Sequence, residues 1–333
     1  MLRHLESNAR RFPLSTARRQ RAASVIFLCL WGAHPAFGCS ECGCSLSSDW
    51  IAQGYPAMPG FQAAVRFEYY DSSDLRTGTG SVNRSSLGFP QADEIQQETL
   101  NRNTWLSLDY VPASPWGLSV QLPFYDRFHS TIAPGDTAIS ESRASGIGDL
   151  RLIARYQKFS LAHSLGFQFG LKLPTGRFSQ DFASGPQAGS PLDRGLQLGN
   201  GTTDLLAGVS YFRRAGVHLG WFAQILADQP LNSRDGFKPS PSVTFNGGLR
   251  YLNPGPVTPQ VQINVRWDGR ERGANADFDN SGDTVAYVSP GITAELGARG
   301  SAFAFVQIPV CQRVNGLQLE PRWLLSVGIQ FRR

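Results

Sequence analysis

The stretch "LGFQFGLKL" (Leu165–Leu173) alternates strictly between large apolar side chains and small or polar ones. Leu and Phe occupy the odd-numbered positions, and Gly, Gln and Lys occupy the even-numbered positions between them. Because successive side chains of a β-strand point to opposite faces, this stretch predicts a strand with one apolar and one polar face. Its length is close to the roughly ten residues with which a tilted strand crosses a bilayer.

The same alternation recurs along the chain, and no long segment has the 3.6-residue apolar rhythm of a helix. Short connections alternate with long ones that are rich in Gly, Ser, Asp, Asn and Pro. We therefore predict an all-β protein: a transmembrane antiparallel β-barrel of about 12 strands with short periplasmic turns and long extracellular loops. The predicted strands lie near 60–70, 101–111, 116–126, 146–157, 164–174, 202–212, 216–226, 242–252, 258–268, 283–296, 300–311 and 319–331, and the long loops occupy 71–100, 127–145, 175–201, 227–241 and 269–282.

A soluble β-sandwich is the alternative architecture, because its strands also alternate apolar and polar side chains. Two features favour the barrel. The predicted strands are longer than the usual five or six residues. Aromatic residues such as Tyr110, Tyr156 and Trp267 gather at strand ends, where membrane barrels carry interfacial girdles.

Residues 1–38 predict a secretory signal peptide. A basic region ends at Arg21, an apolar core of about a dozen residues follows, and Ala36-Phe37-Gly38 resembles a cleavage site. The whole chain has 31 basic and 26 acidic residues, and residues 1–38 hold six arginines and one glutamate. Removing them leaves 25 of each sign, so nucleic acid is not an expected partner.

The next segment, 39–59, is predicted to be a periplasmic, cysteine-rich extension ahead of the barrel at 60–331. Cys39, Cys42 and Cys44 fall within six positions. In an oxidising compartment they could form a disulfide with one thiol left over, bind a metal ion, or carry a lipid on Cys39. The sequence indicates no other cofactor.

Several motifs resemble the outer-membrane proteins grouped as the MetA-pathway of phenol degradation, a transporter-like barrel family. They include "GIGDLRLIARY" (146–156), "GLKLPTG" (170–176), "GNGTTDLLAGVSYF" (199–212) and "VSPGI" (288–292). The resemblance covers roughly residues 60–331 and implies the passage of small, often hydrophobic or aromatic compounds. A shared barrel does not by itself define the solute.

Placing the apolar faces outward assigns the polar side chains to the lumen. Both signs of charge occur there, which predicts either a polar channel with a selectivity filter or a closed barrel held shut by ion pairs. Among these residues, Asp149, Lys172 and Asp204 are expected at one height on neighbouring strands, where they could form a charge network. The lumen and selectivity candidates are Arg66, Glu68, Asp149, Arg151, Arg155, Lys172, Asp204, His218, Arg250 and Arg266.

The rival function classes have weaker sequence support. An outer-membrane lipid hydrolase would need a His-x-Ser pair, but neither His129, expected in a surface loop, nor His163 or His218 has Ser two positions on. We therefore predict that the protein is not an enzyme. A structural or surface-adhesion barrel stays open as an alternative.

The loop "DFDNSGD" (277–283) resembles the start of a calcium loop. The carboxylate that should close such a loop is missing, because Val288 stands at its twelfth position, so a solvated surface loop is favoured. The expected location is the outer membrane with a periplasmic N-terminus. The expected partners are outer-membrane lipid, a small-molecule solute and the barrel-assembly machinery.

Overall fold

The computed structural model describes residues 46, 53, 59–159, 163–252 and 255–333. In these residues the regular structure is β, apart from two single-turn 3-10 helices at Arg84–Ser86 and Arg194–Leu196. No helix among them is long and apolar enough to span a membrane. The strands are β1 (Gly60–Gly78), β2 (Gly80–Ser81), β3 (Ile95–Val111), β4 (Trp116–Ile132), β5 (Ser140–Ile147), β6 (Leu150–Phe159), β7 (His163–Leu173), β8 (Asp204–Ala215), β9 (Leu219–Pro230), β10 (Ser242–Tyr251), β11 (Val257–Asp268), β12 (Asp283–Leu296) and β13 (Gly300–Arg332).

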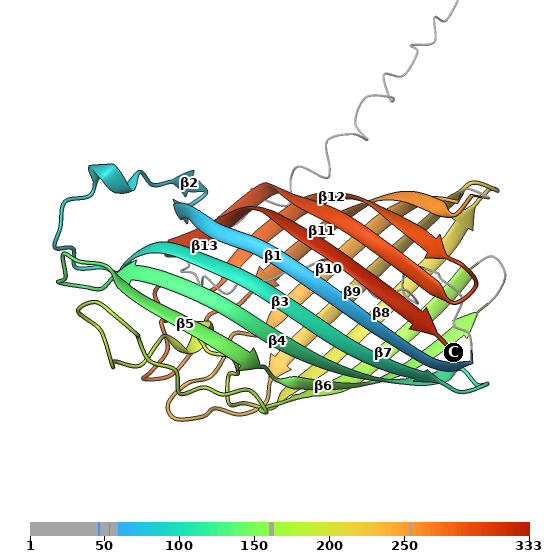
Figure 1. Ribbon diagram of the computed structural model, residues 1–333, viewed down its shortest axis with the longest axis horizontal. Helices are drawn as coiled ribbons and strands as arrows, with labels where there is room; N and C mark the ends of the chain where they lie inside the picture. The colour runs from blue at the N-terminus through green and yellow to red at the C-terminus, as the bar shows by residue number, and fades with distance from the viewer. Residues whose placement is uncertain (1–45, 47–52, 54–58, 160–162, 253–254) are drawn as a thin grey trace, which may run out of the picture. The chain divides into compact units, whose positions relative to one another are not determined.

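Eleven of the strands in this part of the chain form one antiparallel sheet that closes on itself, while β2 and β5 lie outside the ring (Figure 1). The sheet closes where β13 pairs with β1, from Gln62 opposite Arg332 to Gly78 opposite Val314. This closure confirms the predicted barrel, because β1 and β13 pair with each other where an open sheet would end in two free edges.

The strand β13 crosses the barrel wall twice. Its residues 300–314 pair with β12, and its residues 317–332 pair with β1. Between them Gly316 has a φ of 52°, a left-handed conformation that a glycine adopts without steric cost. Arg332 Nη2 donates to Ser301 Oγ over 2.7 Å, so the two ends of β13 lie side by side. With β13 counted twice, the described wall has the twelve crossings that the sequence predicts.

The two ends of the barrel differ. Short connections join β3 to β4, β8 to β9 and β12 to β13 at the end that also holds the C-terminus (Figure 1). We call this the turn end. The opposite, loop end carries the long connections 82–94, 174–203, 231–241 and 269–282, together with β2 and β5. The alternation of turns and loops is therefore as predicted.

The barrel is apolar outside and polar inside. On β7, the outward side chains of Leu165, Phe167 and Phe169 are 40 %, 40 % and 58 % exposed. Inside, Asn264 is fully buried and its Nδ2 donates to Asn246 Oδ1 over 2.7 Å. A soluble sandwich would bury its apolar faces, so this inverted arrangement excludes it and suits a wall surrounded by lipid.

Several strands continue past the length that a bilayer requires. β1 has 19 residues, and β3 and β4 have 17 each. The predicted loops 71–100 and 127–145 are consequently too long, because strand pairing continues into both. The physical reason is that polar side chains stand on both faces of "TLNRN" (99–103), so the sequence loses its alternation while the backbone ladder persists.

Lumenal phenylalanine rings lie directly over glycines of the neighbouring strand. A Cβ atom built on Gly248 would lie 2.2 Å from Phe222 Cε1, and one built on Gly291 would lie 2.1 Å from Phe305 Cδ1. Both distances are far below van der Waals contact, so each glycine makes the room in which the ring packs. These pairs fill part of the barrel interior with aromatic volume.

We predict that Gly248→Ala destabilises the barrel by about 1–3 kcal/mol, because the new methyl group displaces the Phe222 ring in a packed interior. The adjacent Gly247 faces the lipid side, and its Cβ would lie 3.3 Å from the exposed ring of Phe245. Gly247→Ala is therefore the matched control. Urea midpoints, read from heat-modifiable gel migration, measure the difference; equal midpoints for the two variants would contradict this packing.

Candidate functional site

The lumen contains a cavity of about 350 Å³, a volume within the range of small-molecule sites. Inward side chains of the barrel strands form its wall, and parts of the β7–β8 and β9–β10 loops cover it toward the loop end. The charged side chains that line it are Arg66, Arg127, Arg151, Arg155, Lys172, Arg194 and Arg266 together with Glu68, Asp109, Asp149, Asp228 and Asp268.

Trp105 on β3 stands at the centre of one charged group in this wall. The guanidinium carbons of Arg66 and Arg151 lie 5.2 and 4.9 Å from its ring centroid, distances typical of cation–π contacts. Its Nε1 donates to Glu68 Oε2 over 3.1 Å, and Glu68 Oε1 lies 2.9 Å from Arg66 Nε. The ring is thereby fixed between two cations on the lumenal surface.

A second group joins three neighbouring strands. Lys172 on β7 forms an ion pair with Asp204 on β8, and its Nζ lies 3.7 Å from Asp228 Oδ2 on β9. Lys172 and Asp204 face each other in the strand register, so the predicted contact between them is present. Asp228 is the acidic partner that sequence reasoning did not name.

Asp149 has a different role from the one expected of it. Its Oδ1 accepts a hydrogen bond from the backbone amide of Gly176 over 2.9 Å, and its Oδ2 accepts one from that of Asn200 over 3.1 Å. The side chain therefore binds both ends of the β7–β8 loop. A Cβ on Gly176 would lie 2.8 Å from Gly199 Cα, so the two ends of the loop touch at a place where no side chain fits.

The middle of the same loop is held against the lumen wall. Arg127 on β4 donates from Nη1 to the carbonyl oxygen of Gly195 over 3.2 Å and from Nε to Asn101 Oδ1 over 2.7 Å. Arg194, one residue earlier in the loop, stacks on Phe178 and on Phe237, with its Cζ 4.6 and 5.1 Å from the two ring centroids. The loop is thus a fixed part of the cavity wall.

The structure places most of the predicted lumen residues inside. Arg66, Glu68, Asp149, Arg151, Arg155, Lys172 and Arg266 line the cavity, and Asp204 is buried beneath Lys172. Arg155 Nη1 lies 3.3 Å from Asp109 Oδ1. Arg250 is buried, and its Nη1 donates to the carbonyl oxygen of Gln53 over 2.6 Å.

The placement of His218 in the lumen is wrong. β9 begins one residue later, at Leu219, so His218 lies in the turn. There it is exposed and stacks on the outward ring of Tyr251, with a centroid distance of 5.9 Å. The alternation of apolar and polar residues predicts the correct inward face of β9, but it does not predict the residue at which β9 begins.

Sequence reasoning also missed several lining residues. Trp105 shares its face of β3 with Asp109, and Asp228 shares its face of β9 with Gln224. The alternation of side chains between the two faces of a strand could have identified both Trp105 and Asp228. It would have had to be followed further along the chain and applied to aromatic residues as well. Arg194 and Phe237 come from loops, where no periodicity applies.

Two described residues of the segment 39–59 lie inside the barrel. Leu46 packs against Phe303 and Phe305, and Gln53 accepts the hydrogen bond from Arg250. Leu46 also lines the cavity. The predicted signal peptide and the three cysteines Cys39, Cys42 and Cys44 lie outside the described residues.

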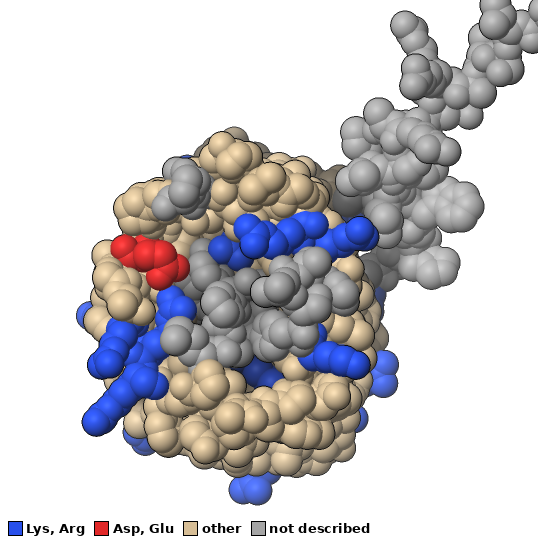
Figure 2. All heavy atoms as spheres, turned by 90° about the vertical axis from the view of Figure 1, so that its right-hand side faces the viewer, with Lys and Arg blue, Asp and Glu red and all other residues tan. Residues whose placement is uncertain are grey.

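Basic side chains predominate at the turn end. Figure 2 shows this end with Lys and Arg around the rim and acidic groups gathered in one place. Exposed basic residues at this end are Lys158 and Arg213 and Arg214 at the ends of β6 and β8, Arg299 in the β12–β13 turn, and Arg333 at the C-terminus. Their shared charge gives this rim a positive potential.

Comparisons with known proteins support the fold. No protein-family model and no curated protein matches this chain in sequence. Among solved structures, the chain is similar to the COG4313 outer membrane channel from Pseudomonas putida F1, with a TM-score of 0.62 and 16 % identity over 84 % of this chain and 97 % of that one. More distant are the NanC porin, with a TM-score of 0.45, 9 % identity and 81 % and 100 % coverage, and the Ralstonia pickettii toluene transporter TbuX, with a TM-score of 0.43, 10 % identity and 83 % and 90 % coverage.

At 16 % identity the likeness shows the fold, which is that of an outer-membrane β-barrel. It agrees with the barrel that the sequence motifs imply. The phenol-degradation family and its solutes stay a prediction, because a fold alone does not define a cargo.

We predict that Asp149→Ala frees the β7–β8 loop, because two backbone amides lose a charged acceptor. Hydrogen exchange of residues 177–199 should become at least about tenfold faster, which corresponds to the roughly 1.5–3 kcal/mol of a charged hydrogen bond. Asp181→Ala, which removes an exposed carboxylate of the same loop, is the control. Unchanged exchange in Asp149→Ala would contradict the anchoring role.

Proposed function

We propose that the protein is an outer-membrane channel that passes small solutes through the barrel, with its turn end and segment 39–59 in the periplasm. We further propose that the lumen favours anionic solutes, including aromatic carboxylates. The observation that carries this preference is the surplus of cations among the described residues of the cavity wall, where seven basic side chains face five acidic ones.

Two of the lining arginines, Arg127 and Arg151, form no ion pair with any residue that the structure describes. Arg151 lies over Trp105 at 4.9 Å, and Arg127 lies over Tyr125 at 5.8 Å. An aromatic carboxylate could place its charge near these guanidinium groups and its ring near the two aromatic side chains. The positive rim of the turn end would also attract anions.

A closed structural or adhesion barrel is the main rival. The cavity of about 350 Å³ favours a channel, although Leu46 and Gln53 occupy part of the interior. Solute uptake into liposomes separates the two proposals. A folded barrel without uptake would leave the lumen with a structural role only.

The lipid-hydrolase alternative has little geometric support. The prediction that His129 lies in a surface loop is wrong, because the residue is buried in β4. Its Nδ1 lies 2.8 Å from Thr99 Oγ1, and its Nε2 lies 4.0 Å from Glu94 Oε1. Thr99 has no exposed surface, so this hydroxyl is not presented to a lipid. We therefore propose that the chain has no catalytic role.

Two charge variants test the anion preference. Benzoate and benzylamine have similar size and opposite charge at neutral pH, so their uptake ratio reports the field of the lumen. Arg151→Gln should lower the benzoate-to-benzylamine ratio by about tenfold, because it removes from a confined site a cation that forms no ion pair with a described residue. Asp228→Asn should raise the ratio, because Lys172 loses one of its partners.

Benzyl alcohol controls for pore size, and its uptake should change little in either variant. The preference would be refuted if both charge variants shifted the ratio in the same direction. Uptake of benzylamine above benzoate by the unmodified protein would refute it as well.

A further inference from the structure

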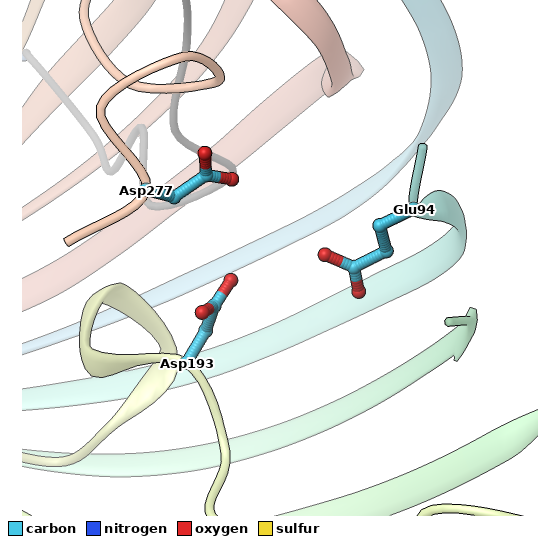
Figure 3. Close-up of side chains that lie close together, drawn as sticks. All are labelled: Glu94, Asp193 and Asp277. Atoms are coloured by element: carbon cyan, nitrogen blue, oxygen red, sulfur yellow. The ribbon is translucent and has the colours of Figure 1, made fainter. Parts of the chain in front are cut away.

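Three carboxylates from three different loops meet at the loop end. Glu94 ends the 82–94 connection, Asp193 lies in the β7–β8 loop, and Asp277 lies in the β11–β12 loop. One oxygen from each lies within 4.8 Å of the others, and the three side chains point toward one another (Figure 3). Like charges at this spacing repel one another unless a proton or a cation lies between them.

A buried imidazole also lies beside one carboxylate of this cluster, that of Glu94. His129 is 1 % exposed, and its Nδ1 is engaged with Thr99 Oγ1. Its Nε2 has no hydrogen-bond partner among the described residues and lies 4.0 Å from Glu94 Oε1. This separation is too long for a hydrogen bond, but two ligands of one metal ion are commonly about 3–5 Å apart.

More buried polar atoms surround the same carboxylate. Thr131 is fully buried and Gln96 is 5 % exposed, and both side chains lie close enough to influence the Glu94 carboxyl. The amide oxygen Oε1 of Gln96 has no hydrogen-bond partner in the part of the chain that the structure describes. Buried polar atoms usually have partners, so this oxygen and His129 Nε2, both on residues beside Glu94, point to a ligand.

We propose that Glu94, Asp193, Asp277 and His129 form a site for a divalent cation. The carboxylate spacing fits Ca²⁺, whose oxygen ligands lie about 2.3–2.6 Å from the ion and hence up to about 5 Å apart. Mn²⁺ accepts the same oxygens and can also bind the imidazole nitrogen. The site extends beyond the channel proposal and does not depend on it.

The cation would connect three loops at the mouth of the barrel. Asp193 is adjacent to Arg194, which lines the lumen cavity, so a bound ion would also hold the β7–β8 loop over the cavity. Asp277 belongs to the "DFDNSGD" stretch, whose calcium-loop pattern is incomplete in sequence. The structure supplies the missing carboxylates from two other loops instead of from position twelve.

The test uses the full-length protein in detergent after removal of metal by EDTA. Mn²⁺ binding is followed by electron paramagnetic resonance, which also detects coupling to an imidazole nitrogen. Ca²⁺ is then added as a competitor. Zn²⁺ is avoided because Cys39, Cys42 and Cys44 could bind it. The structure predicts one bound Mn²⁺, a nitrogen coupling, and displacement by Ca²⁺.

Two asparagine variants separate the cluster from the sequence motif. Asp193→Asn replaces an exposed loop residue, so the barrel should still fold, and Mn²⁺ affinity should fall at least about tenfold. Asp279→Asn is the matched control, because it removes an exposed carboxylate two residues from Asp277 and outside the cluster. His129→Gln should abolish the nitrogen coupling.

The proposal would be overturned if Mn²⁺ did not bind, or if Asp193→Asn and Asp279→Asn reduced the affinity equally. Absence of nitrogen coupling together with carboxylate-dependent binding would remove His129 from the ligand set and keep the three carboxylates. Mn²⁺ binding is measured without any transport. A closed barrel would therefore still bind Mn²⁺, whereas a missing cation site would abolish Mn²⁺ binding whether or not the barrel passes solutes.

Discussion

The structure depends on backbone pairing along the seam between β13 and β1. A strand inside a bilayer has no water to satisfy an open edge, so the sheet must return to its first strand. The register from Gln62 opposite Arg332 to Gly78 opposite Val314 achieves this closure. A closed wall has one face toward lipid and one toward the lumen. Each strand therefore alternates apolar and polar side chains, and the polar set is confined inside the barrel.

The confinement of the polar side chains inside the barrel explains why most of the lumenal charges are paired. It also means that the charges without an ion-pair partner indicate which solutes the lumen favours. Lys172 is balanced by Asp204 and Asp228, and Arg155 by Asp109. Asp149 is balanced by backbone amides instead, and so it fixes the β7–β8 loop as part of the wall. Among the described lining residues, the arginines that form no ion pair, Arg127 and Arg151, lie next to aromatic rings. That combination suits small anions with an aromatic part, which is the basis of the proposed selectivity.

The fold was largely predictable, because the alternation of apolar and polar side chains along each strand depends only on which side chains face the lipid. The stretch Leu165–Leu173 predicts its strand almost to the residue, as β7 shows. The alternation fails where both faces are polar, so the sequence predicts loops where β1, β3 and β4 continue past the length that a bilayer requires. It also misplaced His218, since turn and strand residues look alike at a strand's first position. The cluster of three carboxylates was not predictable, because Glu94, Asp193 and Asp277 are far apart in sequence and meet only through the fold of their loops.

We propose that the closed barrel encloses an anion-preferring path. The most direct test is the reversal potential of the purified protein in a planar lipid bilayer under a potassium chloride gradient. We expect a measurable current that reverses toward the chloride equilibrium potential. A reversal toward the potassium equilibrium potential, or a folded barrel that carries no current, would contradict it.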